Sequence, residues 1–215
     1  MRPFMRLRHV RAPILVGAIA SVALSLAGCG ASEPSYYTLN AVPGVAQGGG
    51  PITLKVRTPS VATMLDRDYI VRNDQDNKLK LAPDAAWGEP LADMIGRGLV
   101  ADLQQRLPGT SVFAEAGSIS TEAQAVVELD VSQFAEDSQG HAEINALLSV
   151  QRPDSGPAQS HVIHLVASPQ GSDVAALAAT LSQLLGQVAD EAAREARALG
   201  PIAPDTQTMP AQPRA

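Results

Sequence analysis

Short runs in which apolar and polar residues alternate predict the first strands of the chain. The run 52–56 alternates in this way, which is typical of a strand with one buried face. Residues 69–72 and 78–81 are two further runs of this kind, and the Asn and Asp residues at 73–77 between them favour a turn. We therefore expect a strand followed by a β-hairpin. Shorter strands are expected at 36–39 and 111–113.

Three longer alternating runs, at 125–134, 143–151 and 160–167, follow in the second half of the chain. In the first of them Val127, Leu129 and Val131 alternate with polar residues. Turn residues separate the runs, Gln139-Gly140 in the first connection and Pro153-Asp154-Ser155-Gly156-Pro157 in the second, so the pattern predicts an antiparallel meander.

Apolar residues at steps of three and four predict two long helices. The first runs from Pro90, which suits a first helical turn, to a stop at Pro108-Gly109. The second begins after Ser172, which we expect to cap it, and ends near Gly200. The apolar stripe of the first helix contains Leu91, Met94, Ile95, Leu99, Leu103 and Leu107, and that of the second contains Val174, Leu177, Leu181, Leu184, Leu185, Val188 and Ala192.

Two glycines interrupt the first of these helices, where each costs about 1 kcal/mol relative to alanine. We expect Gly96 and Gly98 to allow the close approach of a neighbouring element.

The order of elements predicts a single α/β domain over residues 51–199, with a mixed, mainly antiparallel sheet covered by two long helices. Residues 29–50 are expected to be a tether that carries the first short strand, with the glycines at 48–50 as a flexible spacer. The Pro-rich residues 200–215 are expected to be a disordered tail.

The N-terminus has the pattern of a secretory signal peptide. Four arginines precede an apolar run at 13–26, which is shorter than the about 20 residues of a transmembrane helix. The run ends in Leu26-Ala27-Gly28-Cys29, which resembles a bacterial lipobox, with cleavage after residue 28 and a lipid on the Cys29 thiol. The alternative is an ordinary signal peptide with an incidental cysteine. Acyl chains on Cys29 would anchor the protein firmly to a membrane.

Cleavage also changes the charge of the protein. The whole chain has 16 Lys and Arg against 22 Asp and Glu, and loss of residues 1–28 removes four arginines and no acid, which changes the net charge from −6 to −10. This acidic balance excludes nucleic acid as the main partner, because phosphate binding needs clustered basic residues. Cys29 is the only cysteine, so no intramolecular disulfide can form. Gly30, where an Asp commonly signals retention at the inner membrane, indicates transfer to the outer membrane.

The sequence contains little that indicates catalysis. His161 and His164 invite a metal interpretation with His141, but residues three apart on a strand point to opposite faces, so we expect no metal site. Glu89 and Asp93 could be paired carboxylates, but at a helix start they more often complement the helix dipole. No Gly-x-Ser-x-Gly elbow, GxGxxG motif or P-loop occurs, so we expect neither an enzyme nor a cofactor.

One segment indicates a docking surface, for a partner or for a second copy of the chain. It carries residue types that are favoured as interface anchors, including the only tryptophan, next to charged residues in an expected turn. The alternative is purely structural, with the tryptophan packing the helix onto the sheet and Asp66 paired with Arg67. The candidate interface residues are Tyr37, Leu65, Asp66, Arg67, Trp87 and Glu89.

The same segment resembles the PqiC-like family of auxiliary lipoproteins of ABC-type transport systems. Over residues 29–198 the resemblance rests on the lipobox, the closing helix and a series of short motifs. The sequence departs from the family pattern at two places. Gly88 stands where many relatives have Ala, and Gly49-Gly50 lengthen an early loop. The motifs are Tyr36-Tyr37-Thr38-Leu39, Val56-x-x-Pro59, Leu65-Asp66-Arg67, Ile70-Val71, Leu79-x-Leu81, Trp87-x-Glu89-Pro90-Leu91 and the helix with Leu99 and Leu103.

The resemblance implies a three-layer fold like that of anticodon-binding domains. It also implies a lipid-anchored, non-enzymatic protein on the periplasmic face of the outer membrane. The implied partners are an MCE-domain protein and the permease and ATPase of the same inner-membrane system, which together move lipids between the two membranes. Assembly into a homo-oligomeric ring is implied as well. The alternative function is a periplasmic lipoprotein that itself binds a small apolar ligand, and a lipoprotein hydrolase is a third interpretation.

Overall fold

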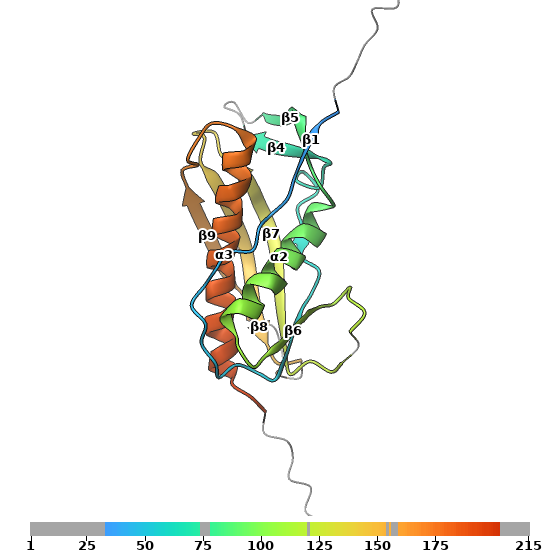
Figure 1. Cartoon of the computed structure of the whole chain (residues 1–215), viewed down its shortest axis with the longest axis vertical. Coiled ribbons are helices and arrows are strands. Elements are labelled where there is room, and N and C mark those ends of the chain that lie inside the picture. The colour runs from blue at the N-terminus through green and yellow to red at the C-terminus, as the bar shows by residue number, and fades with distance from the viewer. Residues whose placement is uncertain (1–32, 74–77, 120, 154, 156–158, 203–215) are drawn as a thin grey trace, which may run out of the picture. The chain divides into compact units, whose positions relative to one another are not determined.

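The computed structural model describes residues 33–202, except 74–77, 120, 154 and 156–158 (Figure 1). The expected signal peptide, Cys29 and nearly all of the Pro-rich tail therefore lie outside the described residues, as does most of the expected turn at 73–77. The described residues from Pro34 onward belong to one compact unit.

The expected helices and strands are present, with differences at some ends. The helices are α2, Leu91–Arg106, and α3, Val174–Leu199. The first strand begins one residue earlier than expected and ends at Tyr37, and the second strand of the hairpin continues to Trp87. The strands are β1 Ser35–Tyr37, β2 Thr53–Val56, β3 Ser60–Val61, β4 Tyr69–Asn73, β5 Leu79–Trp87, β6 Ser111–Ala114, β7 Ala125–Glu136, β8 Ala142–Gln151 and β9 His161–Ala167.

Strand β7 is the centre of one open, mixed sheet. On one side it pairs antiparallel with β8, which in turn pairs antiparallel with β9, as the meander predicts. On its other side it pairs in parallel with β2, β3 and β4 at successive points along its length. The predicted hairpin of β4 and β5 is confirmed, and β1 and β6 add parallel strands at the outer edges. A single α/β domain with a mixed sheet and two helices is therefore confirmed.

The layering differs from the expected three layers. Helices α2 and α3 pack against one another on the same face of the sheet, as Figure 1 shows, so this domain has two layers. Along β8, Ala142, Ile144, Ala146 and Leu148 face the helices and are buried. The opposite face of the sheet carries exposed apolar side chains, among them Leu147 and Val162. The physical reason is that each helix has an apolar stripe wide enough to contact both the sheet and the other helix.

Close helix packing depends on small residues at the crossing. A Cβ atom on Gly98 of α2 would lie 3.0 Å from Leu185 Cδ2 of α3, and one on Gly96 would lie 3.0 Å from Pro59 Cδ. The expected close approach at these two glycines is confirmed.

The expected cap of α3 is wrong by one residue, because the Asp173 carboxylate, rather than Ser172, accepts the Ala176 N–H at 2.7 Å.

Residues 39–47, which we call the strap, cross the outer side of the two helices (Figure 1). The Leu39 N–H contacts the Met94 sulfur of α2 at 3.3 Å, and the Asn40 N–H donates to Ser182 Oγ of α3 at 3.2 Å. A Cβ atom on Gly186 would lie 2.9 Å from Val42 Cβ, so α3 has no room for a side chain under the strap. The segment expected to be a tether is thus packed against the domain from Leu39 onward.

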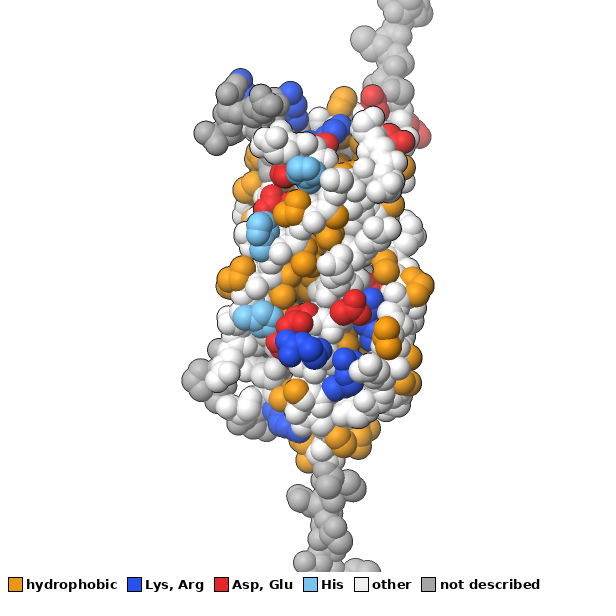
Figure 2. All heavy atoms as spheres, turned by 90° about the vertical axis from the view of Figure 1, so that its left-hand side faces the viewer, with side chains coloured by type: hydrophobic (Ala, Val, Ile, Leu, Met, Phe, Trp, Pro, Cys, Tyr) orange, Lys and Arg blue, Asp and Glu red, His pale blue; other side chains and the backbone are white. Residues whose placement is uncertain are grey.

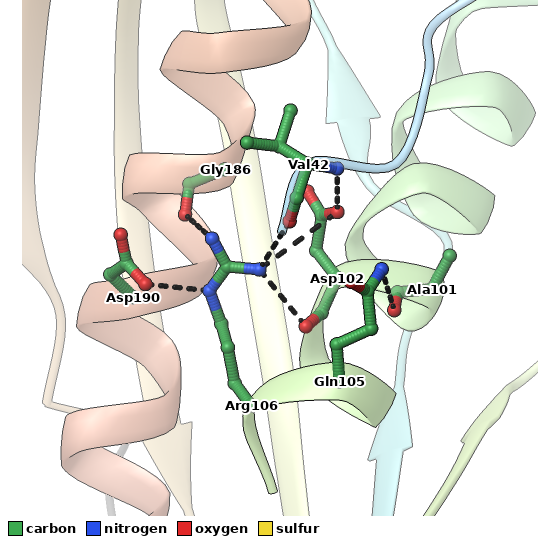
Figure 3. A network of polar contacts seen from close by, with 7 residues as sticks. All are labelled: Val42, Ala101, Asp102, Gln105, Arg106, Gly186 and Asp190. Carbon is green, nitrogen blue, oxygen red and sulfur yellow. Dashed lines mark hydrogen bonds and ion pairs between the residues drawn. The ribbon is translucent and has the colours of Figure 1, made fainter. Parts of the chain in front are cut away.

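A buried arginine fixes the strap to both helices (Figure 3). Arg106, with its side chain 2% exposed, donates from Nη1 to the Val42 carbonyl at 2.9 Å and from Nη2 to the Gly186 carbonyl at 3.0 Å. Its Nε donates to Asp190 Oδ1 of α3 at 2.6 Å. One guanidinium thereby joins the strap, α2 and α3, and its charge is compensated by hydrogen bonds to these two backbone carbonyls and to the partly exposed Asp190 carboxylate.

Asp102 completes this network from one turn earlier on α2. Its Oδ1 accepts the Val42 N–H at 2.6 Å and lies 3.9 Å from Arg106 Nη1, whereas its buried Oδ2 has no hydrogen-bond partner. Burial raises the pKa of the Asp102 carboxyl above its usual range, and the Val42 N–H and Arg106 oppose that shift only in part. The ionised form of Asp102 is therefore disfavoured in the folded protein.

We expect Asp102→Asn to lower the free energy of unfolding less at pH 7 than at pH 4. A carboxyl whose pKa is raised on folding contributes stability below its unfolded pKa and loses it as the pH rises through the folded pKa. At pH 7 the cost of the substitution should be within about 1 kcal/mol, because the amide oxygen can still accept the Val42 N–H. Urea unfolding of both proteins at the two pH values measures this difference. Asp130→Asn, at an exposed site on β7, is the control, and a larger cost at pH 7 than at pH 4 would contradict the prediction.

Candidate functional site

A surface pocket of about 550 Å³ lies where three segments distant in the sequence meet. Strand β1 and the residue before it form one side, the turn that leads into β4 forms another, and the junction of β5 with α2 forms the third. The pocket is lined by Pro34, Tyr36, Asp66, Arg67, Asp68, Tyr69, Ala86, Trp87, Gly88, Glu89 and Pro90.

Backbone hydrogen bonds hold these three segments together. The Trp87 N–H donates to the Asp68 carbonyl at 2.8 Å, which joins the turn to the end of β5, and the Gly88 N–H donates to the Tyr37 carbonyl at 2.8 Å, which joins β5 to β1. Leu65 is fully buried below the turn, and its N–H donates to the Ala62 carbonyl at 2.8 Å. The buried leucine thereby fixes the backbone while the charged residues that follow it point outward.

The structure brings most of the candidate interface residues to this pocket. Asp66, Arg67, Trp87 and Glu89 line it. Leu65 lies in the hydrophobic core instead, and Tyr37 is half-buried against that core. These two residues support the pocket from below rather than contributing to its surface.

The tryptophan is a core residue more than a surface anchor. Trp87 is only 5% exposed, and its ring lies 6.3 Å from that of Phe134, centroid to centroid, at an interplanar angle of 56°. The packing therefore supports the structural alternative for Trp87, in which the ring packs inside the domain and is not an interface anchor. The aromatic surface of the site comes instead from Tyr36, which is 69% exposed, and from Tyr69.

Sequence reasoning missed these two tyrosines for a physical reason. Neighbouring residues on a strand face opposite sides, so only one of Tyr36 and Tyr37 can pack on the core. Which of them does so depends on the register with β5, where Tyr37 lies beside Trp87. Alternation does not indicate the exposure of Tyr69, because Ile70 and Val71 are both buried and the pairing of β4 with β5 shifts register between Tyr69 and Val71.

The pocket is acidic overall. Asp66, Asp68 and Glu89 outnumber Arg67. Glu89 forms an ion pair with Arg97 of α2, and none of the ion pairs found among the described residues joins Asp66 to Arg67. A surface with this charge and two exposed tyrosines suits a partner that presents basic and apolar groups.

The histidines of β9 do not share a site, as their spacing predicts. His164 lies 3.0 Å from Glu143 of β8, whereas His161 lies near two glutamates of α3. No serine, cysteine or histidine is found among the described residues that line the acidic pocket. Neither helix of the described part of the chain is long and apolar enough to cross a bilayer.

Comparison with solved structures places this fold among known proteins. A crystal structure of an uncharacterised protein matches with a TM-score of 0.64 and 22% identity, covering 76% of this chain and 99% of the other. Protein XCC0632 from Xanthomonas campestris, of the DUF330 family, matches with a TM-score of 0.63 and 21% identity, covering 77% of this chain and 96% of the other. At these identities the matches show a shared fold. The comparison with curated proteins gives no match.

The L103M variant of the PelC dodecamer from Paraburkholderia phytofirmans is a more distant match, with a TM-score of 0.41 and 12% identity over 71% of this chain and 95% of the other.

The fold and the pocket together define a class of protein. It is a two-layer α/β domain whose candidate site is an open, acidic surface rather than an enclosed cavity. The model of one family, the ABC-type transport auxiliary lipoprotein component, matches residues 37–193. The chain belongs to this family, which confirms the resemblance to PqiC-like proteins seen in its sequence.

We expect Trp87→Ala and Tyr36→Ala to differ sharply in their effect on stability. Truncation of the buried Trp87 ring should lower the free energy of unfolding by about 3–5 kcal/mol. Truncation of the exposed Tyr36 should change it by no more than about 0.5 kcal/mol. Urea unfolding measures both values, and a cost for Tyr36→Ala comparable with that of Trp87→Ala would show that Tyr36 belongs to the core.

Proposed function

We propose that this protein is a lipid-anchored, non-enzymatic component of an MCE-type ABC transport system. It is held on the periplasmic face of the outer membrane and docks with the periplasmic MCE protein, while the permease and ATPase of the system act in the inner membrane. The transported molecules are lipids that move between the two membranes. The observation that carries this proposal is membership of the auxiliary lipoprotein family over residues 37–193.

The position of the pocket relative to the proposed anchor supports this role. Ser35, where β1 begins, lies six positions after Cys29. Six residues span at most roughly 20 Å. A lipid on Cys29 would therefore hold β1 close to the membrane, and with it the pocket that Pro34 and Tyr36 line.

The pocket then provides the proposed docking surface. Its exposed tyrosines offer contact area at low entropic cost, and its acidic residues favour a partner with a basic surface. Rigid hydrogen bonds from Trp87 and Gly88 hold the pocket in shape before a partner binds, which reduces the cost of association.

The alternative is a lipoprotein that itself binds a small apolar ligand. Sites for such ligands are mostly enclosed and lined by apolar side chains. The acidic pocket has charged walls, and so has a second pocket of about 690 Å³ that Lys55, Arg57, Glu128 and Arg152 line together with other residues. The charged lining of both pockets favours docking over storage of a lipid.

The anchor is tested with Cys29→Ala in the native host. We expect wild type to fractionate with the outer membrane and the variant to become soluble in the periplasm, because the variant lacks the thiol that carries the lipid. Fractionation followed by immunoblotting measures the distribution. If Cys29→Ala stays membrane-bound, the proposed anchor is wrong.

The docking surface is tested with Asp66→Lys, which reverses one charge of the pocket. Co-purification with the MCE protein of the same organism should fall at least about tenfold, since like charges at an interface oppose binding. Asp130→Lys is the matched control, because it makes the same charge change at an exposed position of β7. Failure of the wild type to recover any MCE protein, or equal loss in both variants, would refute the docking surface. Lipid that co-purifies with the isolated monomer would favour the alternative function.

A further inference from the structure

Three side chains with metal-binding groups meet between β9 and α3. His161 comes from the first position of β9, and Glu191 and Glu195 come from the second half of α3. One nitrogen or oxygen from each of them lies within 4.8 Å of the others. Figure 2 shows the face of the molecule on which histidine, acidic and basic side chains gather.

The periodicity of the helix and of the strand turns these three side chains toward one another. Glu191 and Glu195 are four residues apart on a helix, so their side chains lie one above the other on the same face. Along β9, alternate residues from His161 to Ala167 are half-buried, while the residues between them are exposed. His161 therefore lies on the side of β9 that α3 contacts, and His164 does not.

The spacing of the cluster is close to that of a tetrahedral metal site. Ligands that lie 2.0–2.2 Å from a zinc ion are separated from one another by roughly 3.3–3.6 Å. His161 Nε2 lies 3.6 Å from Glu191 Oε1, and His161 Nδ1 lies 3.3 Å from Glu195 Oε1. An imidazole binds an ion through one nitrogen, and the two carboxylates here lie next to different nitrogens of the ring. One carboxylate would therefore have to rotate toward the nitrogen that faces the other, from a starting point at which the three ligand atoms lie within 4.8 Å of one another.

A further observation points to a ligand at this place. His161 Nε2 is shielded from solvent and has no hydrogen-bond partner, an arrangement that costs free energy unless another group satisfies the atom. A cation bound at this nitrogen would satisfy the atom and compensate that cost.

We propose that His161, Glu191 and Glu195 form a binding site for a divalent transition-metal ion of the zinc class. One imidazole and two carboxylates supply three ligands, which leaves a fourth position for water or for a group from outside the chain. The bound ion cross-links the edge strand β9 to α3. The spacing of the histidines predicts no metal site. It could not reveal this one, because two of the three ligands are glutamates from a helix that is distant in the sequence.

Arg194 competes with the ion for the same oxygens. Its guanidinium forms an ion pair with Glu191 and lies 3.9 Å from Glu195 Oε1. Arg194 is mostly exposed, so its removal leaves the packing of α3 intact while it takes a positive charge away from the site. Removal of Arg194 should therefore strengthen metal binding, an effect that a nonspecific loss of structure would not produce.

The test is a titration of the purified, untagged full-length protein, in detergent, with Zn²⁺ by calorimetry and with Co²⁺ by visible absorption. Wild type should bind one ion at this site. His161→Gln and Glu195→Gln should each weaken binding at least about tenfold, as loss of a metal ligand does. Arg194→Gln should tighten it several-fold.

His164→Gln is the matched control, because it removes a histidine of the same strand that faces away from α3. It should leave metal affinity unchanged, and circular dichroism shows whether each variant is folded. The proposal is overturned if wild type does not bind, if both His161→Gln and Glu195→Gln bind as wild type does, or if His164→Gln weakens binding as much as they do. If His161→Gln does not fold, Glu195→Gln and Arg194→Gln decide the question.

Discussion

The buried guanidinium of Arg106 is the interaction on which the arrangement of the domain depends. A charge that is 2% exposed is tolerated only where oxygens surround it, and here they come from the strap and both helices. The Val42 and Gly186 carbonyls and the Asp190 carboxylate belong to segments that are otherwise far apart in sequence. The same side chain therefore fixes the helix pair and the path of the N-terminal segment at once.

The path of that segment in turn determines where the acidic pocket forms. Strand β1 pairs with the end of β5, so that Tyr36 enters the pocket lining while Tyr37 packs toward the core. The buried Leu65 and Trp87 then hold the other two walls. Stability and surface chemistry are separated here, because the residues that support the pocket are buried and the residues that can contact a partner are not.

Sequence periodicity predicts the local elements and not the contacts between distant segments. The stripes of α2 and α3 and the alternation of β7 and β8 are repeated patterns within one element, and they predict the observed buried faces. The two-layer packing could not be inferred, because a stripe does not specify what it packs against. Asp102 and Arg106 are four positions apart, a spacing that in the sequence resembles a surface ion pair, and contacts with the strap and α3 bury them. Asp66, Arg67 and Glu89 were predicted because they cluster near turns, whereas Tyr36 needed the register of β1.

The strap also has a mechanical consequence. Tension applied at the N-terminal end of the described chain reaches β1 first, and β1 is a short strand held by three register pairs with β5, from Ser35 to Tyr37, and by the contacts of Tyr37. The contacts of Val42 with Asp102 and Arg106 bear the load only after those pairs have separated. Force can therefore detach the first strand, and with it one wall of the pocket, while the helices and the rest of the sheet stay folded.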